Sequence, residues 1–337
     1  MAFQRYGRVQ FVKLPLQASL RCKIDSAMRD NRDTVDSRYL FFRTLIDVIL
    51  VIALLISIAL FEFVLVLPAQ RGFFCSDDTL YYPVRPDVVS AKTLVSIVLL
   101  IAMSILFVVE LKIHRSQSRS QRNPSRFSSK VPSFISDFLE HFMFFLFGLL
   151  LTVNATEVGK FTIGRLRPHF MDLCQPQMLD GSTCKSPENH LRYVEQYMCT
   201  AEGFTVFDLI SVRGSFPSIH SSVAFYALVY MSIYVQHKMT WKGSKLFRHV
   251  LQFILISLAW FLALLGLKTY THHWSDVVCG SLLGVVIAVL TARYVTGDFG
   301  THRVGSRTDF HGRDTSASLN ECGAEVAVKH LNEENIN

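Results

Sequence analysis

The stretch Thr271-His272-His273-Trp274-Ser275-Asp276 lies between two long apolar runs. Leu251–Leu267 precedes it and Val277–Val295 follows it, and each run approaches the length of about 20 apolar residues that crosses a bilayer as a helix. A pair of membrane helices would therefore present two imidazoles, an indole and a carboxylate at one membrane surface. Ionisable groups are costly in that setting, so this stretch indicates a chemical role.

The composition supports a membrane protein. Half of the 337 residues are hydrophobic and 18% are charged, and the mean hydropathy is +0.30, which is too apolar for an ordinary soluble domain. The net charge of +7 comes from basic residues in short loops beside the apolar runs, where membrane topology accounts for them. No motif that reads bases accompanies them, so we expect no nucleic-acid partner.

We expect an all-α, polytopic membrane protein with six transmembrane helices, surrounded by membrane lipids. Their approximate ranges are Thr44–Leu67, Thr93–Leu111, Phe138–Val158, Ser221–Val235, Val250–Leu267 and Val277–Val295. Lysine and arginine are concentrated before the first run and after the second, fourth and sixth, and the positive-inside rule places these segments in the cytoplasm. Both termini are then cytoplasmic. The predicted division is a cytoplasmic N-terminal segment (1–43), a membrane domain (44–299) and a disordered cytoplasmic tail (300–337).

Three polar stretches then fall together on the extracellular or lumenal side. They are Lys160–Pro168, Ser215–His220 and Thr271–Asp276. The outside loop Gly159–Phe216, which joins the first two, is basic against the topological trend, and this indicates that its cations are kept for a function. Cations, hydroxyls and imidazoles on one membrane face are the groups that phosphoryl transfer requires.

The first two stretches offer phosphate-binding groups. Lys160 and Arg167 are seven residues apart, which is two turns along one face of a helix. Ser218 precedes the fourth apolar run, and the free N–H groups at a helix N-terminus bind anions. Separately, Lys160 and Arg167 would be snorkelling anchors at the membrane surface, and Ser218 an ordinary helix cap. Their occurrence at one membrane face favours the phosphate site.

The second and third stretches offer catalytic groups. His220 can act as acid or base near neutral pH. His272 and Asp276 are four residues apart, so the carboxylate could fix the imidazole tautomer and leave the other ring nitrogen free to attack phosphorus. The simpler interpretation of His272-His273-Trp274 is an interfacial aromatic belt. The twelve histidines show no metal-ligand spacing, so we expect neither a metal ion nor a cofactor.

Four cysteines fall in the predicted outside loops, where disulfides can form. They are Cys75, Cys174, Cys184 and Cys199. Four thiols allow three pairings. The ten-residue separation between Cys174 and Cys184 favours a local bond, which leaves Cys75 to pair with Cys199.

At these residues the chain resembles the type 2 phosphatidic acid phosphatase family, the integral-membrane lipid phosphate phosphatases, and within it the animal branch that includes the wunen proteins. The family has three motifs: Lys, six residues, Arg-Pro; Pro-Ser-Gly-His; and Ser-Arg, five residues, His, three residues, Asp. The matching positions are Lys160 through Arg167-Pro168, Pro217-Ser218-Ile219-His220, and Leu265-Gly266 followed by His272 and Asp276. The similarity covers roughly Thr44 to Phe299.

The resemblance implies a metal-independent phosphatase that works through a phosphohistidine. His272 would be the nucleophile oriented by Asp276, and His220 would protonate the leaving alcohol. The phosphoryl oxygens would be held by Lys160, Arg167 and Ser218. The implied substrates are phosphatidate, lysophosphatidate, sphingosine 1-phosphate and ceramide 1-phosphate, dephosphorylated on the outer face. The implied setting is the plasma membrane, with a homodimer as the implied assembly.

Two departures from the family motifs bear on activity. Leu265-Gly266 replaces Ser-Arg, which removes a phosphate-binding guanidinium, and Ile219 replaces a glycine that can take positive φ. Lys268 is a candidate replacement charge without the bidentate fork of arginine. The sequence therefore predicts a phosphatase of weakened activity. The alternative is a catalytically impaired membrane protein that binds lipid phosphates or acts as a scaffold. A transporter would show repeats or polar mid-membrane faces, and the sequence shows neither.

Overall fold

The structure is a computed structural model that describes residues 42, 44–61, 69–120, 133–201, 203, 205, 208, 211–239 and 245–297. The chain divides into two compact units, of which Leu50–Gly300 contains the helical bundle and the other combines Met1–Ile49 with Thr301–Asn337. The predicted N-terminal segment, apart from Phe42, and the predicted tail from residue 300 lie outside the described residues. The fold below is therefore that of the larger unit, apart from residues 44–49 at the start of the first described helix.

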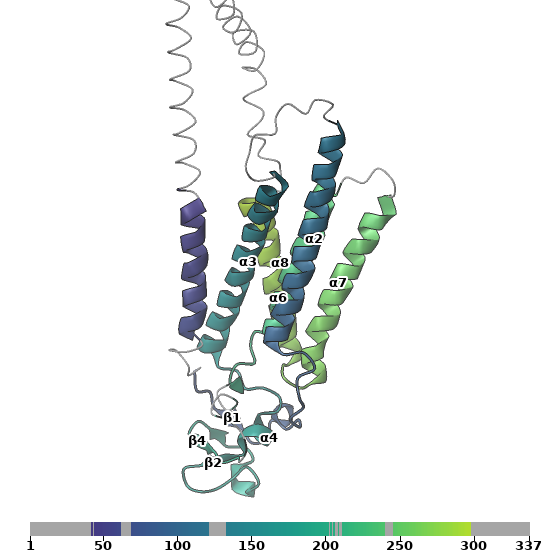
Figure 1. Ribbon diagram of the computed structural model, residues 1–337. Coiled ribbons are helices and arrows are strands. Elements are labelled where there is room, and N and C mark those ends of the chain that lie inside the picture. Colours follow the sequence, from purple (N-terminus) through teal and green to yellow (C-terminus); the bar gives the residue numbers. More distant parts are fainter. Residues whose placement is uncertain are drawn as a thin grey trace, which may run out of the picture. The chain divides into compact units, whose positions relative to one another are not determined.

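Long helices dominate the described chain, and Figure 1 shows them side by side. They are α2 (Ala91–Ser120), α3 (Ser133–Ile163), α6 (Ile219–Lys238), α7 (Lys245–Lys268) and α8 (Trp274–Leu290), which continues as the π-helical turn η3 (Thr291–Val295). Thr44–Phe61 forms a further helix. Five helices are long and apolar enough to cross a membrane: Thr44–Phe61, Ala91–Ser116, Phe134–Ile163, Leu246–Lys268 and Trp274–Val295. The protein is therefore an integral-membrane protein built mostly of helices.

The fourth predicted span forms α6, which is 20 residues long but is not among those five. Helix α6 contacts α2, α3, α7 and α8, and its side chains Tyr226, Tyr230 and Tyr234 are fully buried between them. A helix surrounded by protein does not have to be as apolar as one that faces lipid. Its position accounts for its absence from the five more apolar helices.

Two glycines on α8 let it approach α6 closely. A Cβ atom on Gly280 would lie 2.6 Å from the carbonyl oxygen of Ser218, and one on Gly284 would lie 2.3 Å from that of Ser222. This Gly-x-x-x-Gly spacing is typical of closely packed membrane helices. Because of this contact, the first turn of α6 lies against the first turns of α8, where the polar stretches of both helices begin.

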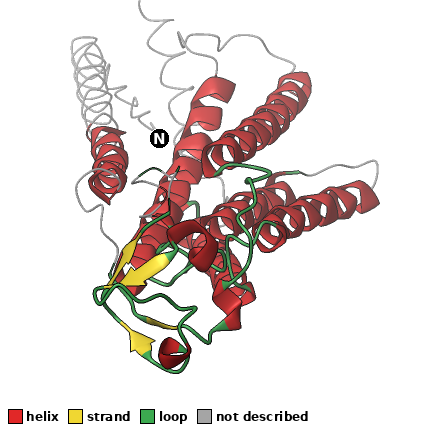
Figure 2. Cartoon of the chain, turned by 90° about the horizontal axis from the view of Figure 1, so that it is seen from below, coloured by secondary structure: helices red, strands yellow, loops and turns green. Residues whose placement is uncertain are grey.

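A small extramembrane layer follows the ends of the bundle helices (Figures 1 and 2). Its short elements are β1 (Phe73–Phe74), η1 (Asp78–Leu80), α4 (Phe170–Cys174), β2 (Pro176–Met178), η2 (Pro187–Asn189), β3 (Tyr193–Val194) and β4 (Tyr197–Cys199). β1 pairs with β3 and β2 with β4, both antiparallel. The rings of Phe73, Phe170 and Tyr197 pack edge to face with centroids 5.0 to 5.5 Å apart. The expectation of helices alone therefore missed these strands.

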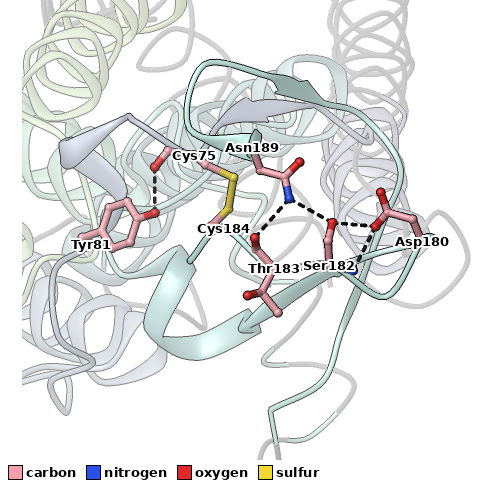
Figure 3. Close-up of a disulfide and its surroundings, with 7 residues drawn as sticks. All are labelled: Cys75, Tyr81, Asp180, Ser182, Thr183, Cys184 and Asn189. Carbon is pink, nitrogen blue, oxygen red and sulfur yellow. Dashed lines mark hydrogen bonds between the residues drawn. A yellow bond between two sulfur atoms is a disulfide. The ribbon is translucent and has the colours of Figure 1, made fainter. Parts of the chain in front are cut away.

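The predicted disulfide pairing is wrong. The bonds join Cys75 to Cys184 and Cys174 to Cys199. Pairing of β2 with β4 sets Pro176 opposite Cys199, which brings Cys199 to the end of α4 at Cys174. Cys184 follows the turn after β2 and is bonded to Cys75, the residue directly after β1, as Figure 3 shows. Short separation along the chain was misleading because strand pairing, which the sequence did not reveal, decides which thiols meet.

Around the Cys75–Cys184 bond, short polar side chains hold the loop in place (Figure 3). Asn189 donates hydrogen bonds from its amide nitrogen to the hydroxyl of Ser182 at 2.9 Å and to the carbonyl oxygen of Thr183 at 3.1 Å. The hydroxyl of Tyr81 donates to the carbonyl oxygen of Cys75 at 2.7 Å. The bond and these contacts fix residues 75–81, which lead into the segment before α2.

Candidate functional site

The three polar stretches meet at the end of the bundle that adjoins the extramembrane layer. The N–H of Ser215 donates to the carbonyl oxygen of Arg165 at 3.0 Å, and the N–H of Ser218 donates to that of Asp276 at 3.1 Å. Nδ1 of His272 lies 2.7 Å from the carbonyl oxygen of Ser215. Backbone hydrogen bonds thus join stretches that are more than 100 residues apart at their extremes.

The two predicted catalytic histidines face each other. The ring centroids of His220 and His272 are 6.2 Å apart, and both side chains are largely buried. A carbonyl oxygen can only accept, so Nδ1 of His272 carries the proton that Ser215 accepts, and Nε2 is left as the nitrogen with a lone pair. In His220 the arrangement is reversed: Nε2 donates to the carbonyl oxygen of Val89 at 2.9 Å, and buried Nδ1 has no partner among the described residues. Each ring therefore keeps one free nitrogen.

Asp276 is placed differently from the expectation. Its Oδ1 accepts from the guanidinium of Arg165 at 2.6 Å, and its Oδ2 accepts from the hydroxyl of Ser215 at 2.6 Å and from the N–H of His273 at 3.0 Å. The hydrogen bond on Nδ1 of His272 goes to Ser215 instead of to Asp276. The expected direct carboxylate–imidazole contact is thus replaced by one through Ser215. The i, i+4 spacing failed because His272 precedes the first turn of α8, so that helical spacing does not apply.

Both predicted cations lie near the histidines. Nζ of Lys160 pairs with the carboxylate of Glu157 at 2.7 Å. The backbone N–H of Arg167 donates to the carbonyl oxygen of Val212 at 2.9 Å. Burial lowers the pKa of His272 well below its ordinary value, and the charges of Arg167 and Lys160 lower it further. Nε of Arg167 is buried without a hydrogen-bond partner among the described residues. A buried guanidinium donor of this kind suits an incoming anion.

Ser218 is fully buried at the start of α6. It is the N-cap residue, and its hydroxyl oxygen accepts from the N–H of Ser221 at 3.5 Å. Capping is the structural role that the sequence also allowed for Ser218. At the same position, the first N–H groups of α6 lie at the end of the bundle that holds His220 and His272. The two roles are compatible because a cap satisfies only part of the free N–H set.

The departures from the family motifs have distinct structural settings. A Cβ atom on Gly266 would lie 3.1 Å from Cδ2 of His272, so a longer side chain at this position would run beside the nucleophile candidate. Lys268 ends α7 with an exposed side chain. Ile219 is the first residue of α6 and packs against the bundle core. Among the described residues, positive φ at non-glycine positions is confined to Gln175 and Tyr270, so Ile219 needs no glycine-like conformation.

The sequence analysis missed the segment 81–90, here called the strap. It contacts two of the stretches directly and the residue before the third. The N–H of Tyr82 donates to the carbonyl oxygen of Pro168 at 3.1 Å, and the carbonyl oxygen of Val89 accepts from Nε2 of His220 at 2.9 Å. The ring of Tyr82 stacks on that of Tyr270, next to Thr271, with centroids 4.5 Å apart. Cζ of Arg85 lies 4.9 Å from the centre of the Tyr270 ring. Backbone carbonyls and ring stacking leave no sequence motif, so only the position of the strap before α2 could have suggested it.

No group of three or more His, Cys, Asp and Glu side chains within the described part of the chain could hold a metal ion. The histidines of the site are each tied to a backbone carbonyl oxygen, His272 to Ser215 and His220 to Val89. The site is thus defined by imidazoles, cations and hydroxyls.

Apolar helices with such a polar site at one end define an integral-membrane protein whose site can bind an anionic group. Residues 141–299 match the PAP2 superfamily. A Drosophila melanogaster protein named "Putative phosphatidate phosphatase" is 39% identical over 260 residues, covering 75% of this chain and 68% of the relative. Phospholipid phosphatase 2 of Bos taurus is 31% identical over 268 residues, covering 79% and 86%, and that of Homo sapiens is 32% identical over 238 residues, covering 69% and 75%.

The chain therefore belongs to the type 2 phosphatidic acid phosphatase family, whose members are membrane phosphatases that hydrolyse phosphoric monoesters. No solved structure matches it.

Proposed function

We propose that the protein is an outward-facing, metal-independent phosphatase that hydrolyses lipid phosphate monoesters of the phosphatidate, lysophosphatidate and sphingosine 1-phosphate class. The observation that carries this proposal is the pair of histidines, whose rings lie 6.2 Å apart and each keep one free nitrogen. One nitrogen carries a lone pair, as a nucleophile requires, and the other can carry a proton, as an acid requires.

The reaction proceeds in two steps. Nε2 of His272 attacks phosphorus, the bond from phosphorus to the ester oxygen breaks, and protonated Nδ1 of His220 gives its proton to the departing alkoxide. Nδ1 of His220, now neutral, then takes a proton from water as that water attacks the phosphohistidine, and Nε2 of His272 leaves. The carbonyl oxygens of Ser215 and Val89 hold the opposite ring nitrogens throughout, so neither ring changes its orientation.

Lys160, Arg167 and the N-terminus of α6 at Ser218 bind the phosphoryl oxygens in this proposal. Charge accumulates on these oxygens as phosphorus is attacked, and fixed donors and cations in a buried site stabilise that charge strongly. The unpartnered Nε of Arg167 supports this assignment because a phosphate oxygen would satisfy it. Asp276 acts on His272 through Ser215.

We also propose the topology and setting that this function needs. The helices are six membrane spans, counting α6, with both termini in the cytoplasm and the site on the extracellular or lumenal side of the plasma membrane. The basic segments beside the predicted spans support this orientation. The domain limits 1–43, 44–299 and 300–337 follow from it. Resemblance to the family supports a homodimer.

A second candidate function rests on Gly266, which stands beside His272 where the family has arginine. One lost guanidinium removes a charge-assisted hydrogen bond to phosphate, which is worth about 1.5–3 kcal/mol, or roughly 10- to 100-fold in rate. A chain disabled by this loss would bind lipid phosphates or act as a scaffold. The retained geometry of His220 and His272 favours catalysis.

Phosphate release from phosphatidate and lysophosphatidate by detergent-solubilised protein, with EDTA present, tests the proposal. We expect activity that falls by about three orders of magnitude or more in His272→Ala, as for loss of other nucleophiles. Activity should persist in His190→Ala, which removes an exposed histidine of the extramembrane layer. Equal activity in parent and His272→Ala would refute the mechanism.

The same assay separates the two candidate functions. Gly266→Arg should raise kcat/KM by about 10-fold or more, because it restores a guanidinium beside the phosphoryl group. Gly266→Ala is the matched control, since it adds only the Cβ atom that lies close to His272. A folded parent that is silent while Gly266→Arg is active would establish the impaired form, and silence in both would favour binding or scaffolding.

A further inference from the structure

Three residues, one from each polar stretch, form a closed ring of hydrogen bonds through their side chains and backbone. The guanidinium of Arg165 donates to Oδ1 of Asp276 at 2.6 Å, and the hydroxyl of Ser215 donates to Oδ2 of the same carboxylate at 2.6 Å. The backbone N–H of Ser215 donates to the carbonyl oxygen of Arg165 at 3.0 Å, which completes the ring. Arg165 and Ser215 lie outside the positions that define the family motifs.

Burial restricts the three residues of this ring to one arrangement. Asp276 and Ser215 have no exposed surface, whereas the side chain of Arg165 is 33% exposed. A buried carboxylate needs a partner for each oxygen, and hydrogen bonds to charged groups are short and strong. Loss of one partner would leave a buried charge incompletely satisfied, so the three residues hold one another in a single arrangement.

The ring fixes Ser215 at two of its three polar groups. Its N–H is held by Arg165 and its hydroxyl by Asp276, and the remaining group is the carbonyl oxygen, which accepts from Nδ1 of His272 at 2.7 Å. The position of this oxygen decides the orientation of the imidazole and the direction of the lone pair on Nε2. A residue that holds a catalytic imidazole in the correct tautomer and orientation acts on the rate of the chemical step.

We propose that Arg165 and Ser215 are positioning residues for His272, which they orient through the carbonyl oxygen of Ser215. The inference rests on the proposed function, in which His272 is the nucleophile. The Nη1 of Arg165 donates to Asp276 at 2.6 Å and to the hydroxyl of Ser275 at 2.7 Å, so we assign this guanidinium to the carboxylate. This distinguishes it from Arg167 two residues later.

The test compares kcat, KM and competitive inhibition by inorganic phosphate in Ser215→Ala and Arg165→Gln. We expect kcat to fall by about 10- to 100-fold in each, with KM and the phosphate inhibition constant within about twofold of the parent. Arg165→Lys keeps a positive charge beside Asp276, so its kcat should be higher than that of Arg165→Gln. The double variant should lose little more than the worse single variant, because both act through one oxygen.

Two matched controls remove similar groups elsewhere. Ser222→Ala deletes another buried serine hydroxyl, which contacts Thr156, and Arg192→Gln deletes another arginine, which pairs with Asp180. Both should keep kcat within about twofold of the parent. If Ser215→Ala does not fold, the more exposed Arg165 variants decide the question.

The outcomes separate this inference from the proposed function. Parent activity that vanishes in His272→Ala but survives undiminished in Ser215→Ala and Arg165→Gln would overturn the positioning role alone. So would losses explained by KM, or losses that multiply in the double variant. A folded parent whose activity does not depend on His272 would overturn the proposed function and this inference with it.

Discussion

At the scale of single residues, the buried setting of His272 predicts how activity depends on pH. Burial, then the charge of Arg167, lowers the pKa of His272 well below the ordinary value of 6.5. Only the neutral imidazole can attack, so a lowered pKa preserves the nucleophile as the pH falls. The pH profile of kcat/KM should therefore show its acid limb below pH 6.5.

The control for this profile is His190→Ala, which should leave the limb in place because the exposed His190 takes no part in the site. A limb at or above pH 6.5 in both proteins would contradict the buried, cation-flanked environment of His272. The sign is fixed by the chemistry, since a raised pKa would move the loss of activity upward in pH instead.

Residue spacing predicted which polar stretches lie close together but not how their residues are connected. The three stretches that hold these residues lie together at one end of the bundle because each stretch lies at the end of a long helix, which the apolar runs made predictable. The link through Ser215 could not be predicted, since it depends on a backbone carbonyl oxygen that every residue carries. The role of Arg165 was hidden for a similar reason: its partner Asp276 lies 111 residues away.

At the scale of elements, the strap predicts a contribution from outside the motifs. Tyr82→Ala removes the ring that stacks on Tyr270, two residues before His272. An aromatic pair is worth about 0.5–1.5 kcal/mol, so we expect kcat/KM to fall by roughly 2- to 12-fold. Tyr82→Phe keeps the ring and should keep parent activity in the same assay. Equal losses in both variants would show that stacking is not the cause.

Helices were predictable and the extramembrane layer was not. Long apolar runs indicated the helices because a segment that faces lipid must be apolar and must satisfy its own backbone hydrogen bonds. The strands β1 to β4 are two or three residues long and carry no periodic pattern. Their pairing sets the disulfides, so the wrong pairing of Cys174 with Cys184 followed directly from the missed strands.

At the scale of the whole molecule, the proposed topology predicts which surfaces antibodies reach on intact cells. An epitope inserted between Asp180 and Gly181, in an exposed turn, should be labelled without permeabilisation. Epitopes at either terminus should be labelled only after permeabilisation. Labelling of a terminus on intact cells would overturn the orientation, and labelling of one terminus alone would mean an odd number of spans.

The strap also sets a limit on how far the molecule can be reduced. The family match begins at residue 141, yet Val89, which holds His220, lies before it. A fragment trimmed to the matching region would keep both histidines but lose the acceptor for Nε2 of His220. The imidazole of His220 could then rotate or change tautomer. The smallest working unit of this protein is therefore wider than its motifs, and any shortened version has to begin before α2.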